Sequence, residues 1–238
     1  MFFAYLPNYL ITHLPYCMIK LNAQQLRESE PTSQQLKQIK RNPLYIIVDN
    51  VLDTYNVGAI FRLADAAAVS GVYLVGQTNI PTDEKVGHKI QKASVGTWKW
   101  TPWEHTDSIQ DAIENIKLSL CHPGQVKRDP GSHSIDSRVR GNDKRKDSGS
   151  VAGMSDSELQ IVAIEQHAKA IPYTEFNYQF PLALILGHET EGVSNEGLEI
   201  ADAIVEIPLF GVNKSLNVMV SLGIVMWHVM QKIDIVKV

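Results

Sequence analysis

The amino-acid sequence predicts an α/β fold with a mostly parallel sheet flanked by helices. Short apolar runs typical of buried strands alternate along the chain with segments of helical periodicity. Residues 44–76 contain strand, helix and strand patterns in succession, and such a unit joins parallel strands. The 238 residues, 44% hydrophobic and 20% charged, have the composition of a globular chain with one sizeable domain or two small ones.

The first strand-helix-strand unit begins with "LYIIVDN" at residues 44–50. This run is apolar and rich in β-branched side chains, so we expect a buried strand. In the segment that follows, Asn56 lies at the expected helix start, where asparagine is a favoured cap, and Gly71 is expected to end the helix. Residues 72–76 then form the second predicted strand.

The middle of the chain continues the alternation. Residues 93–104 hold three tryptophans, and their spacing predicts an edge strand, although tryptophans more often occupy core positions. Residues 107–120 predict an amphipathic helix capped by Asp107 or Ser108. The remaining predicted elements are strands at 159–166 and 182–187, a short helix at 194–203, and a strand from Ala203 to Pro208.

The last helix has a polar entry and an apolar body. From Leu216 to Met230 the chain contains no Lys, Arg, Asp or Glu. We expect Ser215 to cap this helix and Asn217 to lie in its first turn. A helix that is apolar nearly all round needs more than one buried face, which either a second copy of the chain or a crowded core would supply. The surplus of polar residues in the entry indicates that this loop binds a ligand.

Two segments differ in composition from the rest. Residues 1–17 are apolar but lack a basic n-region and a cleavage site, and we expect a non-native or disordered extension ahead of a start at Met18. Residues 122–156 contain no aromatic side chain and few aliphatic ones, so we expect a disordered insert, with a basic RNA-binding arm as the alternative. The expected organisation is one domain, 18–238, that this insert interrupts.

Composition excludes several classes of protein. A net charge of -4 argues mildly against bulk nucleic-acid binding, so any RNA contact must come from a local patch. The two cysteines have no metal-ligand or redox spacing, which indicates a cytoplasmic protein without a metal. No segment predicts a transmembrane helix. Neither a G-x-G-x-x-G fingerprint nor a P-loop is present.

Three loops at expected strand ends carry the polar residues of interest. They are "NVGAIFR" at 56–62, "LGHETEGVS" at 186–194 and "IPLFGVNKSLN" at 207–217. Each has a structural explanation by itself, such as a surface arginine or a helix-terminus charge. Ligands of open α/β sheets bind beyond the carboxyl ends of strands, so the common location of the three loops is the stronger signal.

These three stretches resemble the motifs of the SpoU/TrmH-type RNA ribose 2'-O-methyltransferases of the SPOUT superfamily. The patterns N-x-G-x-x-x-R, G-x-E-x-x-G and I-P-x-x-G…S-L-N occur in the family's order, and the resemblance covers the chain from about Lys20 onward except the insert. It implies a C-terminal trefoil knot, which general topology rules make very rare. It also implies a bound S-adenosylmethionine and a homodimer through the last helix.

The resemblance also implies roles for individual residues. Arg62 matches the residue that activates the ribose hydroxyl, but because a guanidinium stays protonated we interpret it as a phosphate contact that stabilises the developing alkoxide. The catalytic set it implies is Asn56, Arg62, Glu189, Ser215 and Asn217. The cofactor-binding set is Ile164, Leu186, Gly187, Ile207, Leu209, Ser215 and Leu216, with no metal. The candidate RNA-binding residues, from the residues themselves, are Lys85, Lys89, Lys92 and Lys99.

The function expected from these observations is S-adenosylmethionine-dependent methylation of an RNA ribose 2'-hydroxyl. We favour tRNA over ribosomal RNA as the substrate. The alternatives are a non-catalytic dimeric RNA-binding protein that keeps the fold and, more weakly, a small-molecule methyltransferase. We expect a cytoplasmic protein without a membrane association, and deletion of residues 122–155 is expected to leave cofactor binding intact.

Overall fold

A computed structural model of the chain describes residues 30–121 and 158–233. Seven strands form one sheet in the order β3-β2-β1-β6-β4-β7-β5, and each of its pairings is parallel. The strands are β1 (Asn42–Asp49), β2 (Val69–Val75), β3 (Trp103–Thr106), β4 (Gln160–Ile164), β5 (Ile171–Pro172), β6 (Leu182–Leu186) and β7 (Ala203–Glu206). The α/β fold with a parallel sheet is therefore confirmed.

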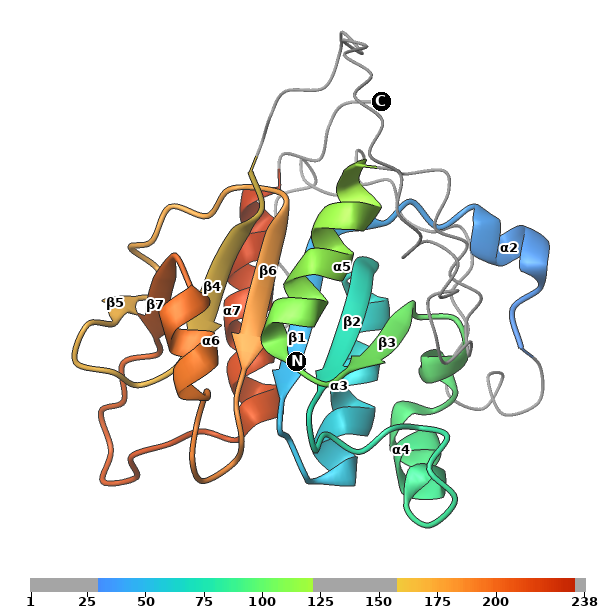
Figure 1. Cartoon of the computed structure of the whole chain (residues 1–238), viewed down its shortest axis with the longest axis horizontal. Coiled ribbons are helices and arrows are strands. Elements are labelled where there is room, and N and C mark those ends of the chain that lie inside the picture. The colour runs from blue at the N-terminus through green and yellow to red at the C-terminus, as the bar shows by residue number, and fades with distance from the viewer. Residues whose placement is uncertain (1–29, 122–157, 234–238) are drawn as a thin grey trace, which may run out of the picture.

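Helices cover both faces of this sheet (Figure 1). The helices of the described residues are α2 (Ser33–Lys37), α3 (Thr54–Ala66), α4 (Gly87–Ser94), the 3-10 helix η1 (Thr97–Lys99), α5 (Ile109–Cys121), α6 (Asn195–Ile200) and α7 (Val218–Lys232). Helices α3 and α7 pack on one face, and α5 and α6 pack on the other. None of the helices in the described part of the chain is long and apolar enough to cross a membrane.

The central strands are buried on both faces, which explains their continuous apolar sequence. In β1, Ile46 and Val48 contribute to the core under α3 and α7, whereas Tyr45 and Ile47 contribute to the core under α5. Successive side chains of a strand point to opposite faces, so a parallel strand covered by helices on both sides needs apolar residues at every position. The prediction of a buried strand at 44–50 is thus confirmed.

All seven strands point the same way, so their carboxyl ends meet at one edge of the sheet, the lower edge in Figure 1. Strand β6 lies between β1 and β4, which brings residues distant in sequence together there. The loops that leave this edge include 50–53 after β1, 187–194 after β6 and 207–217 after β7. These are the loops that carry the three sequence motifs.

Two predicted element boundaries in the first half are wrong. Helix α3 ends at Ala66, and Gly71 lies inside β2 rather than at the end of the helix. Ala68 has a positive φ of 46°, so the chain reverses direction there without a glycine. The alanine run has high helix propensity, and the helical pattern therefore continues in the sequence beyond the point where the chain turns.

The predicted edge strand at 93–104 is largely replaced by short helical segments and turns. Helix α4 ends at Ser94, residues 97–99 form η1, and only the four residues from Trp103 are in an edge strand. Burial is confirmed for two of the three tryptophans, since Trp100 is 5% and Trp103 9% exposed, whereas Trp98 is only partly buried. The indole Nε1 of Trp100 donates a hydrogen bond of 2.7 Å to Asp65 Oδ1 on α3, which satisfies its polar atom in the interior.

Capping residues are partly as predicted. Ser108 Oγ accepts a hydrogen bond of 3.1 Å from the Asp111 N–H, so Ser108 rather than Asp107 caps α5. Strand β7 ends at Glu206 instead of Pro208. The predicted extension 1–17 and the whole of the predicted insert 122–156 lie outside the described residues.

Candidate active site

Three side chains connect the three motif loops at the carboxyl edge of the sheet. The Asn56 Nδ2 group donates a hydrogen bond of 3.0 Å to Glu189 Oε1, and Asn217 Nδ2 donates one of 2.9 Å to Asn56 Oδ1. Asn56 comes from α3, Glu189 from the loop after β6, and Asn217 from the start of α7. The predicted convergence of these three residues is therefore found in the structure, and we call them the Asn-Asn-Glu network.

Asn56 is the central member of the network, and it is not the helix cap that the sequence predicts. Asp53 caps α3, with its Oδ1 accepting a hydrogen bond of 2.7 Å from the Tyr55 N–H. Asn56 is one turn further on and only 6% exposed. Its amide uses the donor toward one loop and the acceptor toward the other, a double role that a carboxylate cannot perform.

Glu189 contacts the first turn of α3. Its carboxylate accepts hydrogen bonds from the backbone N–H groups of Leu52, at 3.3 Å, and Asp53, at 3.0 Å. Burial by itself would raise the pKa of the Glu189 carboxyl, but the hydrogen bonds from Asn56 and from these N–H groups outweigh burial and lower the pKa below its ordinary value. Glu189 is thus an ionised anion held at a helix N-terminus.

The loop that carries Glu189 is closed on itself. His188 and Gly192 form an antiparallel bridge, with two hydrogen bonds of 2.9 Å between their backbones. A β-carbon on Gly187 would lie 2.1 Å from the Gly192 carbonyl carbon, so only glycine fits there. The glycines of this motif are therefore explained by the close approach of the two ends of the loop.

The entry to α7 differs from the prediction in its cap. Asn217 is the N-cap, and its Oδ1 accepts a hydrogen bond of 2.9 Å from the Met219 N–H, so Ser215 does not cap the helix. Ser215 is exposed, and its backbone N–H donates to Asn213 Oδ1 at 3.4 Å. Asn217 thus starts the helix and joins the network with one amide group, because its oxygen and its nitrogen point to different partners.

Arg62 lies on α3, exposed to solvent and outside the network. It forms no hydrogen bond or ion pair with another residue in the described part of the chain. Arg62 follows Asn56 by six positions, so the two side chains do not share a face of the helix. The guanidinium is consequently available to an anionic partner, as the predicted phosphate contact requires.

Gly58 has a packing role that the motif alone does not reveal. A β-carbon at this position would lie 2.5 Å from Ala93 Cβ and 2.9 Å from the Ile90 carbonyl oxygen. Helix α4 therefore packs directly on α3 at Gly58.

Of the four predicted RNA-binding lysines, Lys89 and Lys92 lie on the exposed side of α4 and Lys85 lies just before it, whereas Lys99 forms an ion pair with Glu30.

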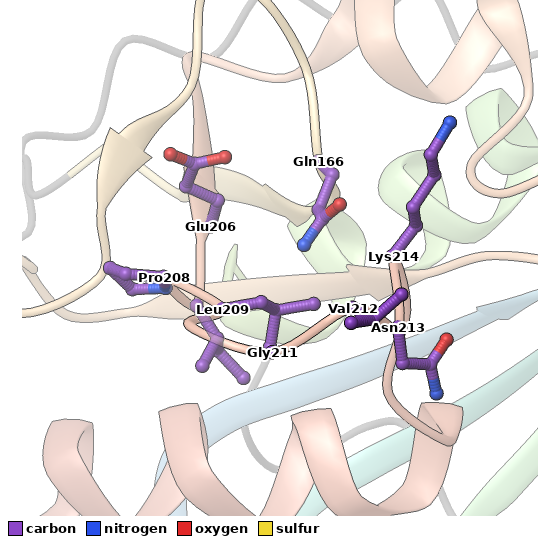
Figure 2. A pocket seen from close by; sticks show the side chains of 9 residues that line it. Gln166, Glu206, Pro208, Leu209, Gly211, Val212, Asn213 and Lys214 are labelled. Atoms are coloured by element: carbon purple, nitrogen blue, oxygen red, sulfur yellow. The ribbon is translucent and has the colours of Figure 1, made fainter.

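A pocket of about 400 Å³ opens beside the loop after β7 (Figure 2). Its lining residues are Gln166, Glu206, Ile207, Pro208, Leu209, Gly211, Val212, Asn213 and Lys214. Two of the predicted cofactor-binding residues, Ile207 and Leu209, are among them. The predicted residue sets leave out Gln166, Glu206 and Lys214. Signals in the sequence pointed to two of them, since Gln166 ends a predicted buried strand and Lys214 lies in the polar loop that was predicted to bind a ligand.

The other predicted cofactor residues do not line this pocket. The side chains of Ile164 and Leu186 are buried in the core at 8% and 1% exposure, so only their backbone groups are candidates for a ligand contact. Gly187 is enclosed by its own loop, and Ser215 and Leu216 are exposed beyond the pocket. The structure therefore brings together part of the predicted cofactor set.

An open parallel sheet with polar loops gathered beyond its carboxyl edge is the architecture of a ligand-binding α/β domain. The sequence profile of the SpoU rRNA Methylase family matches residues 43–135 and 147–227. These residues are more than half of the chain, and the chain belongs to this family. The profile match leaves out residues 136–146, which lie within the predicted insert.

Individual relatives agree with the family. A tRNA (guanosine(18)-2'-O)-methyltransferase of Aquifex aeolicus is 26% identical over 90% of this chain and 78% of its own length. A protein of the same name from Escherichia coli K12 is 25% identical over 79% of this chain, which spans only 64% of that relative. The chain is thus similar to tRNA methyltransferases, and its match leaves out about a third of the E. coli relative.

Solved structures show the same fold. The A. aeolicus TrmH/SpoU tRNA modifying enzyme has a TM-score of 0.56 and 26% identity, with 83% of this chain and 82% of that one covered. The SpoU methyltransferase AviRb from Streptomyces viridochromogenes, solved with AdoMet, has a TM-score of 0.58 and 20% identity, with 82% and 63% covered. At that lower identity the second likeness concerns the fold alone.

Proposed function

We propose that this chain transfers a methyl group from S-adenosylmethionine to a ribose 2'-hydroxyl of RNA, with tRNA as the substrate class. The observation that carries the proposal is the Asn-Asn-Glu network, which joins the loops of all three family motifs through two hydrogen bonds. Membership of the SpoU rRNA methylase family and the names of the tRNA-modifying relatives support the reaction and the substrate.

The pocket beside the loop after β7 fits the proposed cofactor. Its volume of about 400 Å³ lies in the range of small-molecule sites. Leu209 and Ile207 would contact the apolar surface of the cofactor. The Glu206 carboxylate would accept hydrogen bonds from its amine and hydroxyl groups, and the Gln166 amide would accept or donate hydrogen bonds there. When bound, S-adenosylmethionine would supply a methyl group on a sulfonium, which is already a good leaving group.

The chain's own residues would then orient the acceptor. Arg62 would bind a phosphate next to the target ribose and stabilise negative charge on the 2'-oxygen as the methyl group moves to it. The hydroxyl proton would pass to a phosphate oxygen or to water, because a guanidinium does not accept it. Asn56 and Glu189 would hold the start of α3, and Asn217 would hold the loop at the pocket in register with it. Ser215 would contact the substrate.

The RNA would extend from Arg62 across α4. Helix α4 packs on α3 at Gly58 and presents Lys89 and Lys92 to solvent. Lysines that neutralise phosphates position an RNA without reading its sequence. A local patch of this kind reconciles RNA binding with the net charge of -4.

We also propose a homodimer, a trefoil knot and a cytoplasmic location. The dimer is supported by an exposed apolar stripe on α7 that includes Val220 and Trp227, the latter 48% exposed. Phe210 and Val212, on the loop beside the pocket, are fully exposed and would be covered in the same assembly. The knot is supported by the family fold, and the location by the RNA substrate.

The test uses purified protein, methyl-labelled S-adenosylmethionine, and separate undermodified tRNA and ribosomal RNA. We expect label in tRNA within alkali-resistant dinucleotides, the mark of a 2'-O-methyl group. Arg62→Ala should lower the rate about 100-fold or more, as loss of a charge-stabilising donor does, and should leave cofactor binding unchanged. Label in ribosomal RNA alone would show that ribosomal RNA, and not tRNA, is the substrate. Binding of RNA without label in either class would identify a non-catalytic RNA-binding protein.

A further inference from the structure

Two carboxylates outside the motifs hold the loop that carries Glu189. Glu165 directly follows β4, and its Oε2 accepts a hydrogen bond of 2.8 Å from the Val193 N–H. Asp49 is the last residue of β1, and its Oδ2 accepts one of 2.8 Å from the Ser194 N–H. Strands β1 and β4 are the two neighbours of β6 in the sheet, so the loop leaving β6 is held from both sides.

We propose that Glu165 and Asp49 are positioning residues that fix the 187–194 loop and so place the Glu189 carboxylate against α3. The inference deepens the proposed function and rests on it for the effect on the reaction. Neither residue reaches the Asn-Asn-Glu network, and each acts through the backbone of the loop at consecutive N–H groups. The two carboxylates together are called the loop clamp.

The glycine at 192 provides an independent observation for this role. A β-carbon there would lie 2.2 Å from Glu165 Oε2 and 2.8 Å from its carboxyl carbon. Gly192 also has a φ of +75°, a conformation that other residues rarely adopt. The last glycine of the motif thus leaves the space that the Glu165 carboxylate occupies, so the motif and the clamp are parts of one arrangement.

The two hydrogen bonds that Glu165 accepts differ in how far they are buried. The bond from Val193 is partly buried, whereas the bond from the Gln166 N–H, 2.8 Å long at Oε1, is exposed and replaceable by water. Glutamine at position 165 can therefore keep the bond from Val193 with its amide oxygen. Alanine removes both acceptors and leaves the Val193 N–H without its partner.

The clamp would matter for rate more than for RNA affinity. Glu189 spans from its own loop to the Leu52 and Asp53 N–H groups and to Asn56, and a loop displaced by about 1 Å no longer makes all of these bonds. Displacements of that size in a positioning group reduce rates by about 100-fold. The RNA contacts assigned to α4 are on another element and would be unaffected.

The test compares Glu165→Ala, Glu165→Gln and a matched control, Asp202→Ala. Asp202 Oδ2 accepts a hydrogen bond of 2.7 Å from the Ile161 N–H at the opposite end of β4, so the control removes the same kind of bond far from the loop. We expect Glu165→Ala to lower kcat by 10- to 100-fold with KM for RNA within about 3-fold. Glu165→Gln and Asp202→Ala should stay within about 3-fold of the parent chain.

Two further measurements identify how Glu165 acts. In a Glu189→Gln background, Glu165→Ala should produce almost no additional loss, because both changes remove the same function. Independent of activity, amide hydrogen exchange at Val193 and Ser194 should accelerate at least 10-fold in Glu165→Ala and in Asp49→Ala, and remain unchanged in Asp202→Ala.

Additive losses in the double variant, or unchanged exchange at Val193 in folded Glu165→Ala, would overturn the clamp. If the parent chain does not methylate RNA, the proposed function fails. The exchange rates and the NMR titration of Glu189 still test whether Glu165 and Asp49 fix the loop, because neither measurement requires activity. In that titration Glu165→Ala should raise the pKa of Glu189 toward its ordinary value, since its hydrogen bonds would weaken. An unchanged titration would contradict the inference.

Discussion

Asn56 is the residue on which the candidate site depends most. Its buried amide is the common partner of Glu189 and Asn217, so it joins the start of α3 to the loops after β6 and β7. An isosteric aspartate would keep the acceptor for Asn217 and place a negative charge against the Glu189 carboxylate. Asparagine is therefore the residue type that the geometry requires, since it offers one donor and one acceptor in a neutral group.

Replacing Asn56 by alanine should lower the free energy of unfolding by about 1–3 kcal/mol, because two partly buried hydrogen bonds are lost. Urea denaturation measures this change. Methyl transfer should fall at the same time, because Glu189 and Asn217 lose their connection. Asn115→Ala is the matched control, since Asn115 Nδ2 donates a bond of 3.0 Å to Glu104 Oε1 away from the site. It should leave activity unchanged, and an equal loss of activity in both variants would contradict the assignment.

Glu189 should make stability depend on pH in a defined direction. Its pKa is lower in the folded chain than the ordinary value of 4.5, so the folded state favours the ionised form. The resulting stabilisation is fully present above about pH 4.5 and is lost as the pH falls through the lowered pKa. Unfolding measured from pH 7 to pH 3 should show the stability difference between the parent chain and Glu189→Gln shrinking at the acid end. A difference that grows on acidification would show the opposite shift.

At the scale of elements, the start of α7 combines a structural and a functional role. Asn217 caps the helix with its oxygen and contacts Asn56 with its nitrogen, whereas Ser215 contributes only a backbone donor to its own loop. Helix α7, which packs on the same face of the sheet as α3, is thereby connected to the candidate site by a direct hydrogen bond. Movement of the loop between β7 and α7 is thus limited at its helical end.

Asn217→Ala should destabilise the chain by about 1 kcal/mol or more, the usual cost of losing an N-cap. Ser215→Ala should change stability by less than about 0.5 kcal/mol, as an exposed substitution does. Thermal and urea unfolding of the two variants, side by side, measure this contrast. A larger loss in Ser215→Ala would restore Ser215 as the cap.

Helix α4 should determine RNA affinity rather than the chemical step. Lys89→Glu with Lys92→Glu should raise KM for tRNA several-fold and leave kcat nearly unchanged, because phosphate contacts contribute mainly to binding. The slope of log affinity against log salt should become shallower in the double variant. Lys117→Glu, an exposed lysine on α5 across the sheet, is the control and should change neither quantity. A fall in kcat with unchanged KM would contradict a role of α4 in RNA binding.

At the scale of the whole molecule, exposed apolar side chains gather on α7 and beside the pocket. Val220 is 39% exposed, and Phe210 is 99% exposed. Contiguous exposed apolar patches mark interaction surfaces, and a symmetric dimer would bury the same patch on both copies. The dimer proposed above would thus place a second chain next to each pocket.

Val220→Glu with Trp227→Glu should convert a dimer to a monomer in sedimentation equilibrium, because two charges would be buried in the interface. Leu118→Glu, at an exposed leucine of α5 on the other face of the sheet, should leave the assembly unchanged. Dissociation in both variants would indicate general destabilisation, and a parent chain that sediments as a monomer would contradict the dimer.

The sequence by itself determined the α/β class, the buried strands and the loops that supply the network. Strands β1, β4 and β6 are detectable because burial on both faces requires apolar residues throughout, and local pattern is sufficient to recognise them. Asn56, Glu189 and Asn217 are recognisable because the motifs mark loops at strand ends. Their hydrogen bonds and their roles as cap or partner are not local properties.

Only the tertiary structure decided which residues support that network. Glu165 and Asp49 lie 28 and 145 positions from the N–H groups that they bind, and strand order alone makes them neighbours of the β6 loop. The helix that ends at Ala66 and the cap at Asn217 likewise depend on where the chain turns and what it meets there. Propensity acts between near neighbours in sequence, whereas sheet order, glycine contacts and carboxylate partners are set by packing between distant segments.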